Sequence, residues 1–272
     1  MAFARLAAIA AVSIVLTGCI NSATLIRLKP DGSGTVEQTT LMNTATLKGV
    51  LGGLEAQGAK PAGPVFNEAD LKKQAERMGG VTFVSAEPVK GANGFEGMKA
   101  LYSFTDINKV RVDQDPNMSG TTSGGSFAAT EATTKNPLVF TLAKSGDNSL
   151  LTVTFPDQVK GAPAAEPETP QGGPDMANPQ MLAMMKTMFD GFKVGIDLEV
   201  AGSIVKTNAD YVSGSRVTLL EMDLGQLLQD EAKLKQLQSK VRPGASISEV
   251  KPYLKDIKGI KINDPVVTVE FK

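Results

Sequence analysis

The stretch TLIRLKPDGSGTVEQTTLM, residues 24–42, decides the fold. Its first six and last eight residues are rich in apolar and β-branched side chains, which indicates two strands. The segment PDGSG between them, residues 30–34, is made of residues that favour tight turns. A calcium loop starting at Asp31 is the alternative, but it would need acidic residues at its third, fifth and twelfth positions, which are absent. We therefore expect a β-hairpin.

Further strands and helices follow this hairpin along the chain. The sequence predicts strand pairs over 81–89 with 94–105, 137–143 with 149–155, and 192–200 with 216–222, and a last strand over 265–271. It predicts helices over 45–55, 67–78, 179–189, 224–238 and 246–255. Hairpins separated by helical segments favour an α+β fold, with largely antiparallel β-hairpins and helices packed on one face.

The residues upstream of the hairpin look like an export signal. Met1 to Arg5 carry one positive charge, an apolar run covers residues 6–16, and Leu16-Thr17-Gly18 leads to Cys19. The run is too short to cross a bilayer as a helix. A lone cysteine is otherwise a small buried hydrophobe or a free thiol. Its position after this signal favours a lipobox instead.

The lipobox resembles those of bacterial lipoprotein precursors. This resemblance implies a signal peptide over 1–18 and a diacylglycerol-modified Cys19, so that the membrane is a partner through an N-terminal lipid anchor. Residues 19–23 are then a short tether, roughly 13 Å long if extended, and the domain rides close to the membrane. We expect the cell envelope, facing the periplasm or exterior. Ile20 after the cysteine allows outer-membrane sorting.

Two segments bear on how the rest of the chain is divided. We expect residues 24–272 to form a single α+β extracytoplasmic domain with flexible loops at about 113–135 and 161–178. The second loop is rich in Pro, Ala and Gly and is long enough to separate two domains, which is the alternative.

Composition removes several functional classes. The chain has no histidine and a single cysteine, so Ser-His-Asp and Cys-His sites cannot form. A net charge of −1 and 5% aromatic residues do not suit nucleic-acid binding. We therefore expect a protein that is not an enzyme, without cofactor or metal, and with no nucleic-acid partner.

Two Ser-x-x-Lys motifs could suggest a serine nucleophile. Ser203 and Lys206 lie in a β-rich region, where this spacing puts the two side chains on opposite faces of a strand. Ser248 and Lys251 lie in a predicted helix, where the serine is explained by helix capping. Neither motif predicts catalysis.

A methionine stripe marks the predicted helix over 179–189. Met181, Met184, Met185 and Met188 fall at helical spacing, with Met176 upstream. Such a stripe is typical of a core-facing helix, and it also suits contact with an apolar ligand or partner, or binding of Cu(I).

Two segments together resemble the LppM-like class of bacterial lipoproteins. The first is the lipobox followed closely by a strand, Asp31-Gly32-Ser33-Gly34 and a second strand. The second covers residues 192–219 and contains Thr207-Asn208-Ala209 between two strands. The class implies a lipid anchor that carries an α+β domain of poorly defined activity, and it assigns no functional residue to this chain.

These observations predict a membrane-anchored extracytoplasmic lipoprotein that acts as a non-catalytic binding or envelope-associated module. Its expected partner is an envelope protein or a lipid, and Cys19 is its one predicted functional residue. The alternative is a carrier of a lipid or another hydrophobic ligand, held in an apolar interior that includes the methionine-rich helix.

Overall fold

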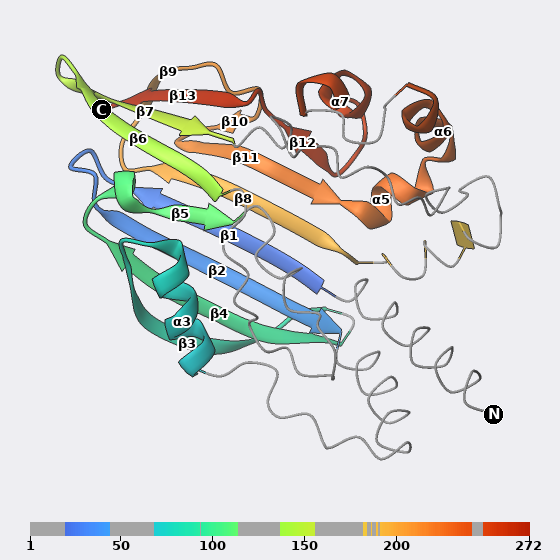
Figure 1. Ribbon diagram of the computed structural model, residues 1–272, viewed down its shortest axis with the longest axis horizontal. Helices are drawn as coiled ribbons and strands as arrows, with labels where there is room; N and C mark the ends of the chain where they lie inside the picture. Colours follow the sequence, from blue (N-terminus) through green and yellow to red (C-terminus); the bar gives the residue numbers. More distant parts are fainter. Residues whose placement is uncertain are drawn as a thin grey trace, which may run out of the picture.

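The computed structural model describes residues 20–43, 68–92, 94–113, 137–155, 182–183, 186, 189, 191–240 and 247–272, which form mainly two β-sheets (Figure 1). The large sheet contains β1 (Ile20–Leu28), β2 (Gly34–Asn43), β3 (Val81–Lys90), β4 (Phe95–Phe104), β8 (Lys193–Val200), β10 (Val212–Ser213), β11 (Arg216–Asp223) and β12 (Ile260–Ile262). The small sheet contains β5 (Arg111–Asp113), β6 (Pro137–Ser145), β7 (Asn148–Thr154), β9 (Ile204–Thr207) and β13 (Val266–Phe271). The helices whose full range lies in the described part are α3 (Glu68–Met78), the 3-10 helix η1 (Ile107–Lys109), α5 (Leu224–Gln229), α6 (Glu231–Lys240) and α7 (Ile247–Leu254).

The large sheet is mixed and the small sheet is antiparallel. The strand order of the large sheet is β10-β11-β8-β1-β2-β4-β3, with β12 also paired to β11, and that of the small sheet is β5-β6-β7-β13-β9. The predicted pairs β3–β4, β6–β7 and β8–β11 are confirmed as antiparallel. The sequence did not indicate that β1 and β8 lie side by side as parallel strands, with Asn21 opposite Lys193.

The hairpin predicted from residues 24–42 is confirmed. β1 and β2 pair from Ile20 opposite Met42 to Leu28 opposite Gly34. In the turn, Asp31 Oδ1 accepts hydrogen bonds from Ser33 Oγ at 2.7 Å and from Ser33 N at 2.9 Å. These bonds lower the pKa of Asp31, and they show a carboxylate used to close a turn. β1 begins at Ile20, four residues before the start that the sequence indicated.

The predicted α+β class is wrong, because the described part of the protein is β-rich. We expected helices to cover one face of a sheet, but the inner face of the large sheet is covered by a second sheet (Figure 1). The described helices cover less of the sheet: α3 lies against β3, and α7 lies beside β12. Sequence periodicity identified the strands, but it could not show that they divide into two sheets that bury each other.

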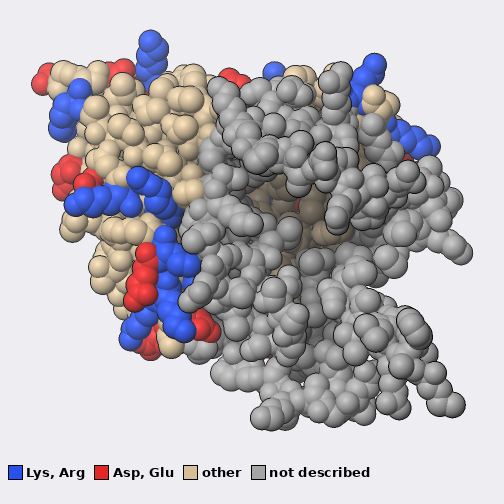
Figure 2. Space-filling view, viewed as in Figure 1, with Lys and Arg blue, Asp and Glu red and all other residues tan. Residues whose placement is uncertain are grey.

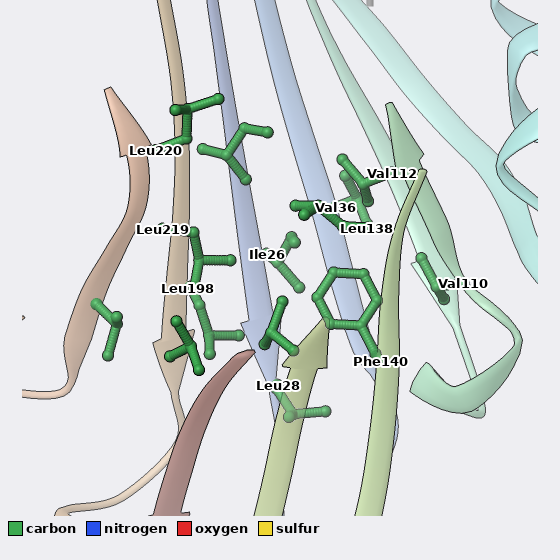
Figure 3. Close-up of a cluster of buried hydrophobic side chains, with 14 of the residues drawn as sticks. Ile26, Leu28, Val36, Val110, Val112, Leu138, Phe140, Leu198, Leu219 and Leu220 are labelled. Carbon is green, nitrogen blue, oxygen red and sulfur yellow. The ribbon is translucent and has the colours of Figure 1, made fainter. Parts of the chain in front are cut away.

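The main core lies between the two sheets. Ile26 of β1, Leu28 of β1 and Phe140 of β6 are each at most 1% exposed, and they meet across the interface (Figure 3). Val36 of β2 and Leu198 of β8 extend the same layer on the large sheet. Each of these residues occupies an inward position of an alternating strand, so the period of two in the sequence becomes one apolar face.

The predicted helix over 224–238 is two helices that meet at Asp230. The Asp230 carboxylate accepts a hydrogen bond from Lys233 N at 3.0 Å and so caps the start of α6. The predicted helix over 67–78 is confirmed as α3, with Ala75 and Met78 buried.

Several predicted features lie outside the described residues. These are residues 1–18 and Cys19, the helix over 45–55, residues 114–135 and 161–178 of the two loops, and Met176, Met181, Met184, Met185 and Met188. In the part of the chain that the structure describes, no helix is long and apolar enough to cross a membrane.

Candidate functional site: the polar band of the large sheet

Four buried polar side chains lie together on the inner face of the large sheet. Ser22 and Thr24 belong to β1, and Gln38 and Thr40 belong to β2; each is at most 8% exposed. The hairpin register places Ser22 opposite Thr40 and Thr24 opposite Gln38. These residues occupy inward positions that are apolar elsewhere on the two strands. We call this group the polar band.

The polar band separates two apolar clusters on the same face. On one side, Ile26 of β1 and Val36 of β2 begin the main core. On the other side lies a smaller set, which we call the second cluster: Ile20, Met42, Phe192 and Val194, with Phe189 and Leu224 packed against it. The inner face therefore changes from apolar to polar and back to apolar along β1.

A short hydrogen-bond chain links the polar band to α3. Gln74 Nε2 donates to Gln38 Oε1 at 2.6 Å, and the Tyr102 hydroxyl donates to Gln74 Oε1 at 3.3 Å. Burial raises the pKa of the Tyr102 phenol far above its ordinary value of 10, so this hydroxyl stays protonated and acts as a donor. The band is therefore neutral at physiological pH and offers hydroxyl and amide groups.

Ser22 stands apart within the polar band. Its side chain is 2% exposed, and its Oγ has no hydrogen-bond partner among the described residues. A buried hydroxyl without a partner costs about 1–3 kcal/mol of folding free energy. Such a group is a candidate contact for a ligand, because it would gain a hydrogen bond that no described residue supplies.

The outer face of the large sheet differs, because it carries charges in cross-strand pairs. Arg27 lies 3.2 Å from Glu37 and 3.6 Å from Glu199, and Glu199 also accepts from Arg216 at 3.0 Å. These partly exposed pairs are each worth at most about 1 kcal/mol. Their mixed signs give this face a balanced rather than a single-sign charge. On the opposite side of the molecule, the described part in Figure 2 also shows basic and acidic side chains close to one another.

The structure separates the two Ser-x-x-Lys motifs from the polar band. Ser203 and Lys206 are both exposed on or beside β9, and the Ser203 backbone N donates to Lys272 O. Lys251 Nζ lies 2.7 Å from both Asp210 and Asp264. Burial alone would lower the pKa of Lys251, but the hydrogen bonds to the two carboxylates outweigh it and raise the pKa. The amine is therefore held as a charged ion-pair partner.

The structure describes little of the predicted lipidation site and of the predicted methionine-rich helix. Cys19 lies outside the described residues, and the first described residue, Ile20, belongs to the second cluster. Phe189, which ends the predicted methionine-rich helix, packs against that cluster and makes an edge-to-face contact with Phe192 at 6.0 Å. Within the described ranges, no group of three or more His, Cys, Asp or Glu side chains is placed to hold a metal ion.

Sequence reasoning missed the polar band. Its signal was available in principle, because Ser22 and Thr24, and likewise Gln38 and Thr40, repeat at a spacing of two in phase with the apolar residues of the same strands. Reading it requires knowing which face of the hairpin is inward at that end. That depends on the second sheet and on β8, which are remote in sequence.

Comparison with known proteins gives little further information. No family model matches the chain, and no curated protein matches it. Among solved structures, it is similar to the folded domain of LppM from Mycobacterium tuberculosis, determined by NMR. The two share 9% sequence identity over 94% of this chain and 91% of that chain, with a TM-score of 0.34. The LppM-like class named from the sequence is thus met again as a weak structural similarity, too weak to support an argument about function.

Proposed function

We propose that this protein is a membrane-anchored extracytoplasmic lipoprotein whose β-rich domain acts by binding rather than catalysis. The observation that carries the proposal is the lipobox, Leu16-Thr17-Gly18-Cys19, placed directly before a folded domain. β1 begins at Ile20, so a lipidated Cys19 would be separated from the central strand of the large sheet by one peptide unit, about 3.8 Å between Cα atoms. The domain would then lie at a nearly constant distance from the membrane surface, where a partner could bind it.

Intact-mass analysis of the protein from native membranes tests the anchor. We expect the chain to start at Cys19 and to carry the added mass of diacylglycerol. Cys19→Ala should remain unlipidated and uncleaved, because the thiol is the site of the modification. Ala23→Ser, an exposed change on β1 outside the lipobox, is the matched control and should be processed normally. An unmodified cysteine in the membrane-derived protein contradicts the proposal.

Photo-crosslinking in native membranes tests the partner. A photoreactive residue at Val84, which is 52% exposed on β3, reports on contacts without entering the core. A discrete protein crosslink that disappears in Cys19→Ala supports a binding module that depends on anchoring. Crosslinks to lipid alone favour the second candidate function below.

The second candidate is a carrier of a lipid or another hydrophobic ligand. The polar band supports it, because neutral hydrogen-bonding groups between two apolar clusters suit a molecule with one neutral polar group and an apolar chain. Ser22 Oγ, which has no hydrogen-bond partner in the described part of the chain, and the partly exposed Phe189 at the second cluster would both contact such a ligand. This proposal places the ligand on the inner face of the large sheet, next to the anchor.

Extraction of the purified protein with organic solvent, followed by mass spectrometry, tests the carrier. We expect a bound lipid that is depleted in Gln38→Leu, because this change removes the end of the hydrogen-bond chain that belongs to the polar band. Ser149→Ala is the control, since it changes a buried serine of the small sheet away from the polar band. Extraction that yields no lipid from the native protein counts against a carrier and leaves the anchored binding module.

A further inference from the structure

One end of the large sheet is defined by the start of β1. The strand registers place Met42 opposite Ile20, Glu96 opposite Met42, and Lys90 opposite Glu96. On the other side of β1, Asn21 lies opposite Lys193 at the start of β8. This row crosses β3, β4, β2, β1 and β8, and its strands end together in Figure 1. We call it the anchor end.

The anchor end presents small and aromatic residues. Gly91 and Ala92 in the turn after β3 are exposed, and Phe95 at the start of β4 is half-buried. A Cβ on Gly191 would come within 3.0 Å of Phe95 Cζ, so the Phe95 ring packs on the segment that leads into β8. Phe189 is also half-buried, on the second cluster. Two partly exposed aromatic rings therefore lie close to the start of β1.

The opposite end of the same sheet is charged. The turn between β1 and β2 exposes Lys29 and Asp31, and the neighbouring turn between β6 and β7 exposes Asp147. The nine residues of β1 separate the two ends by roughly 30 Å at 3.3 Å per residue. The two ends therefore differ in the partly exposed aromatic rings of the anchor end and not in exposed charge, because Lys90 and Glu96 of the anchor end are 85% and 49% exposed.

Several charges at the anchor end and on the neighbouring strands β11 and β12 are paired with one another. Lys193 and Lys261 both contact Glu221, at 3.1 and 2.8 Å, and Lys90 lies 3.8 Å from Glu96. Burial would raise the pKa of Glu221, but the hydrogen bonds from Lys261 and Lys193 lower it overall, so this carboxylate keeps its charge and its partners. Paired charges lose less than isolated ones when a surface approaches a medium of lower polarity.

We propose that the anchor end is the surface that rests on the lipid bilayer, with Phe95 and Phe189 at the level of the headgroups. This inference deepens the proposed function and rests on lipidation of Cys19. With one peptide unit between the lipid-bearing residue and β1, the domain cannot turn the opposite end of the sheet toward the membrane. Aromatic side chains are suited to the membrane–water interface, where an apolar ring meets polar headgroups.

Depth measurements on the lipidated full-length mature protein test this orientation. Cys19 is the only cysteine and its thiol would be consumed by the lipid, so one introduced cysteine takes a fluorescent probe specifically. We would label Ala92→Cys and Lys90→Cys at the anchor end, and Asp31→Cys and Asp147→Cys as matched exposed positions at the far end. Each protein is placed in vesicles of phosphatidylethanolamine and phosphatidylglycerol that contain a spin-labelled quencher lipid.

Strong quenching of the probes at positions 90 and 92, with none at 31 and 147, is the expected result. Equal quenching at both ends, or stronger quenching at 31 and 147, overturns the proposed orientation. Using two positions per end prevents one misfolded variant from deciding the outcome. The mass of each protein is measured first. A missing lipid on Cys19 refutes the anchor itself, whereas lipidated protein without a quenching difference refutes only the membrane-contact surface.

Discussion

Replacing Ser22 with alanine should stabilise the ligand-free protein, which is unusual for a change at a buried position. Ser22 Oγ is buried and has no partner among the described residues, so its removal relieves a desolvation cost of about 1–3 kcal/mol and loses no hydrogen bond. Part of this gain is offset by lost packing around the deleted oxygen. We expect the free energy of unfolding to rise by about 1 kcal/mol.

Ser149 provides a matched comparison on the small sheet. It is 1% exposed, and its Oγ donates to Pro30 O at 3.1 Å and accepts from Lys144 Nζ at 3.3 Å. Ser149→Ala therefore removes the same atom together with two hydrogen bonds and should cost about 1–2 kcal/mol. The two variants, identical in chemistry, should change stability in opposite directions.

Urea denaturation followed by circular dichroism measures both changes. A gap of about 2–3 kcal/mol between the variants corresponds to midpoints roughly 1 M urea apart, for a slope near 3 kcal/mol per M. The proteins are first freed of lipid by solvent extraction. If Ser22→Ala lowers the midpoint as Ser149→Ala does, Ser22 Oγ has a partner in the free protein. Ser22 Oγ would then offer no unused hydrogen bond to a ligand in the polar band.

Three further predictions, two of them with a matched control variant, test the core, one ion pair and one close backbone contact. Phe140→Ala should lower the free energy of unfolding by about 3–5 kcal/mol, because it empties the space between the sheets, whereas Val205→Ala at a 50% exposed position should change it by less than about 0.5 kcal/mol; equal effects would contradict the two-sheet core. Lys251→Met should cost about 2 kcal/mol at neutral pH. Because the pKa of Lys251 is raised from 10.5, this ion-pair contribution is complete below pH 10.5 and is lost as the pH rises through the higher folded-state value. As the pH is raised from neutral, the urea midpoints of wild type and Lys251→Met should therefore converge only above pH 10.5, and convergence near neutral pH would refute the assignment. Gly202 has φ +126°, and an added Cβ would lie 2.0 Å from Lys272 O, so Gly202→Ala should lower the free energy of unfolding by about 3 kcal/mol. Gly146 has φ +60° and open space around it, so Gly146→Ala should lower it by about 1 kcal/mol. Thermal unfolding that ranks the two variants otherwise counts against the described contact between Gly202 and Lys272.

The features predicted from sequence are those encoded by neighbouring residues. The turn at Asp31, the pairing of β6 with β7 and the course of α3 depend on short-range turn and cap chemistry, and each is confirmed. Asp230 shows the limit of this approach. It caps α6 and divides one predicted helix into two, although the helical spacing of the apolar residues around it predicted one continuous helix.

The fold class and the polar band could not be predicted for the opposite reason. The parallel pairing of Asn21 with Lys193 joins residues 172 positions apart (193 minus 21), and no local pattern specifies it. Ile26 and Leu28 are covered by a second sheet and not by helices, and the residues of that sheet are likewise far from them in the sequence. Without that cover, inward and outward positions of β1 look alike, and buried hydroxyls cannot be told from surface ones.

The strand order also sets when this protein can fold during its synthesis. β1 leaves the ribosome first but lies between β2 and β8, so its second neighbour is made only after most of the chain. The small sheet can be completed only later, because β13, which follows all its other strands in the sequence, lies between β7 and β9. Neither sheet can close on a nascent chain, and pairings this distant are slow to form. The chain should therefore stay open until synthesis is nearly complete, which is the state in which a polypeptide can be threaded through a translocation pore.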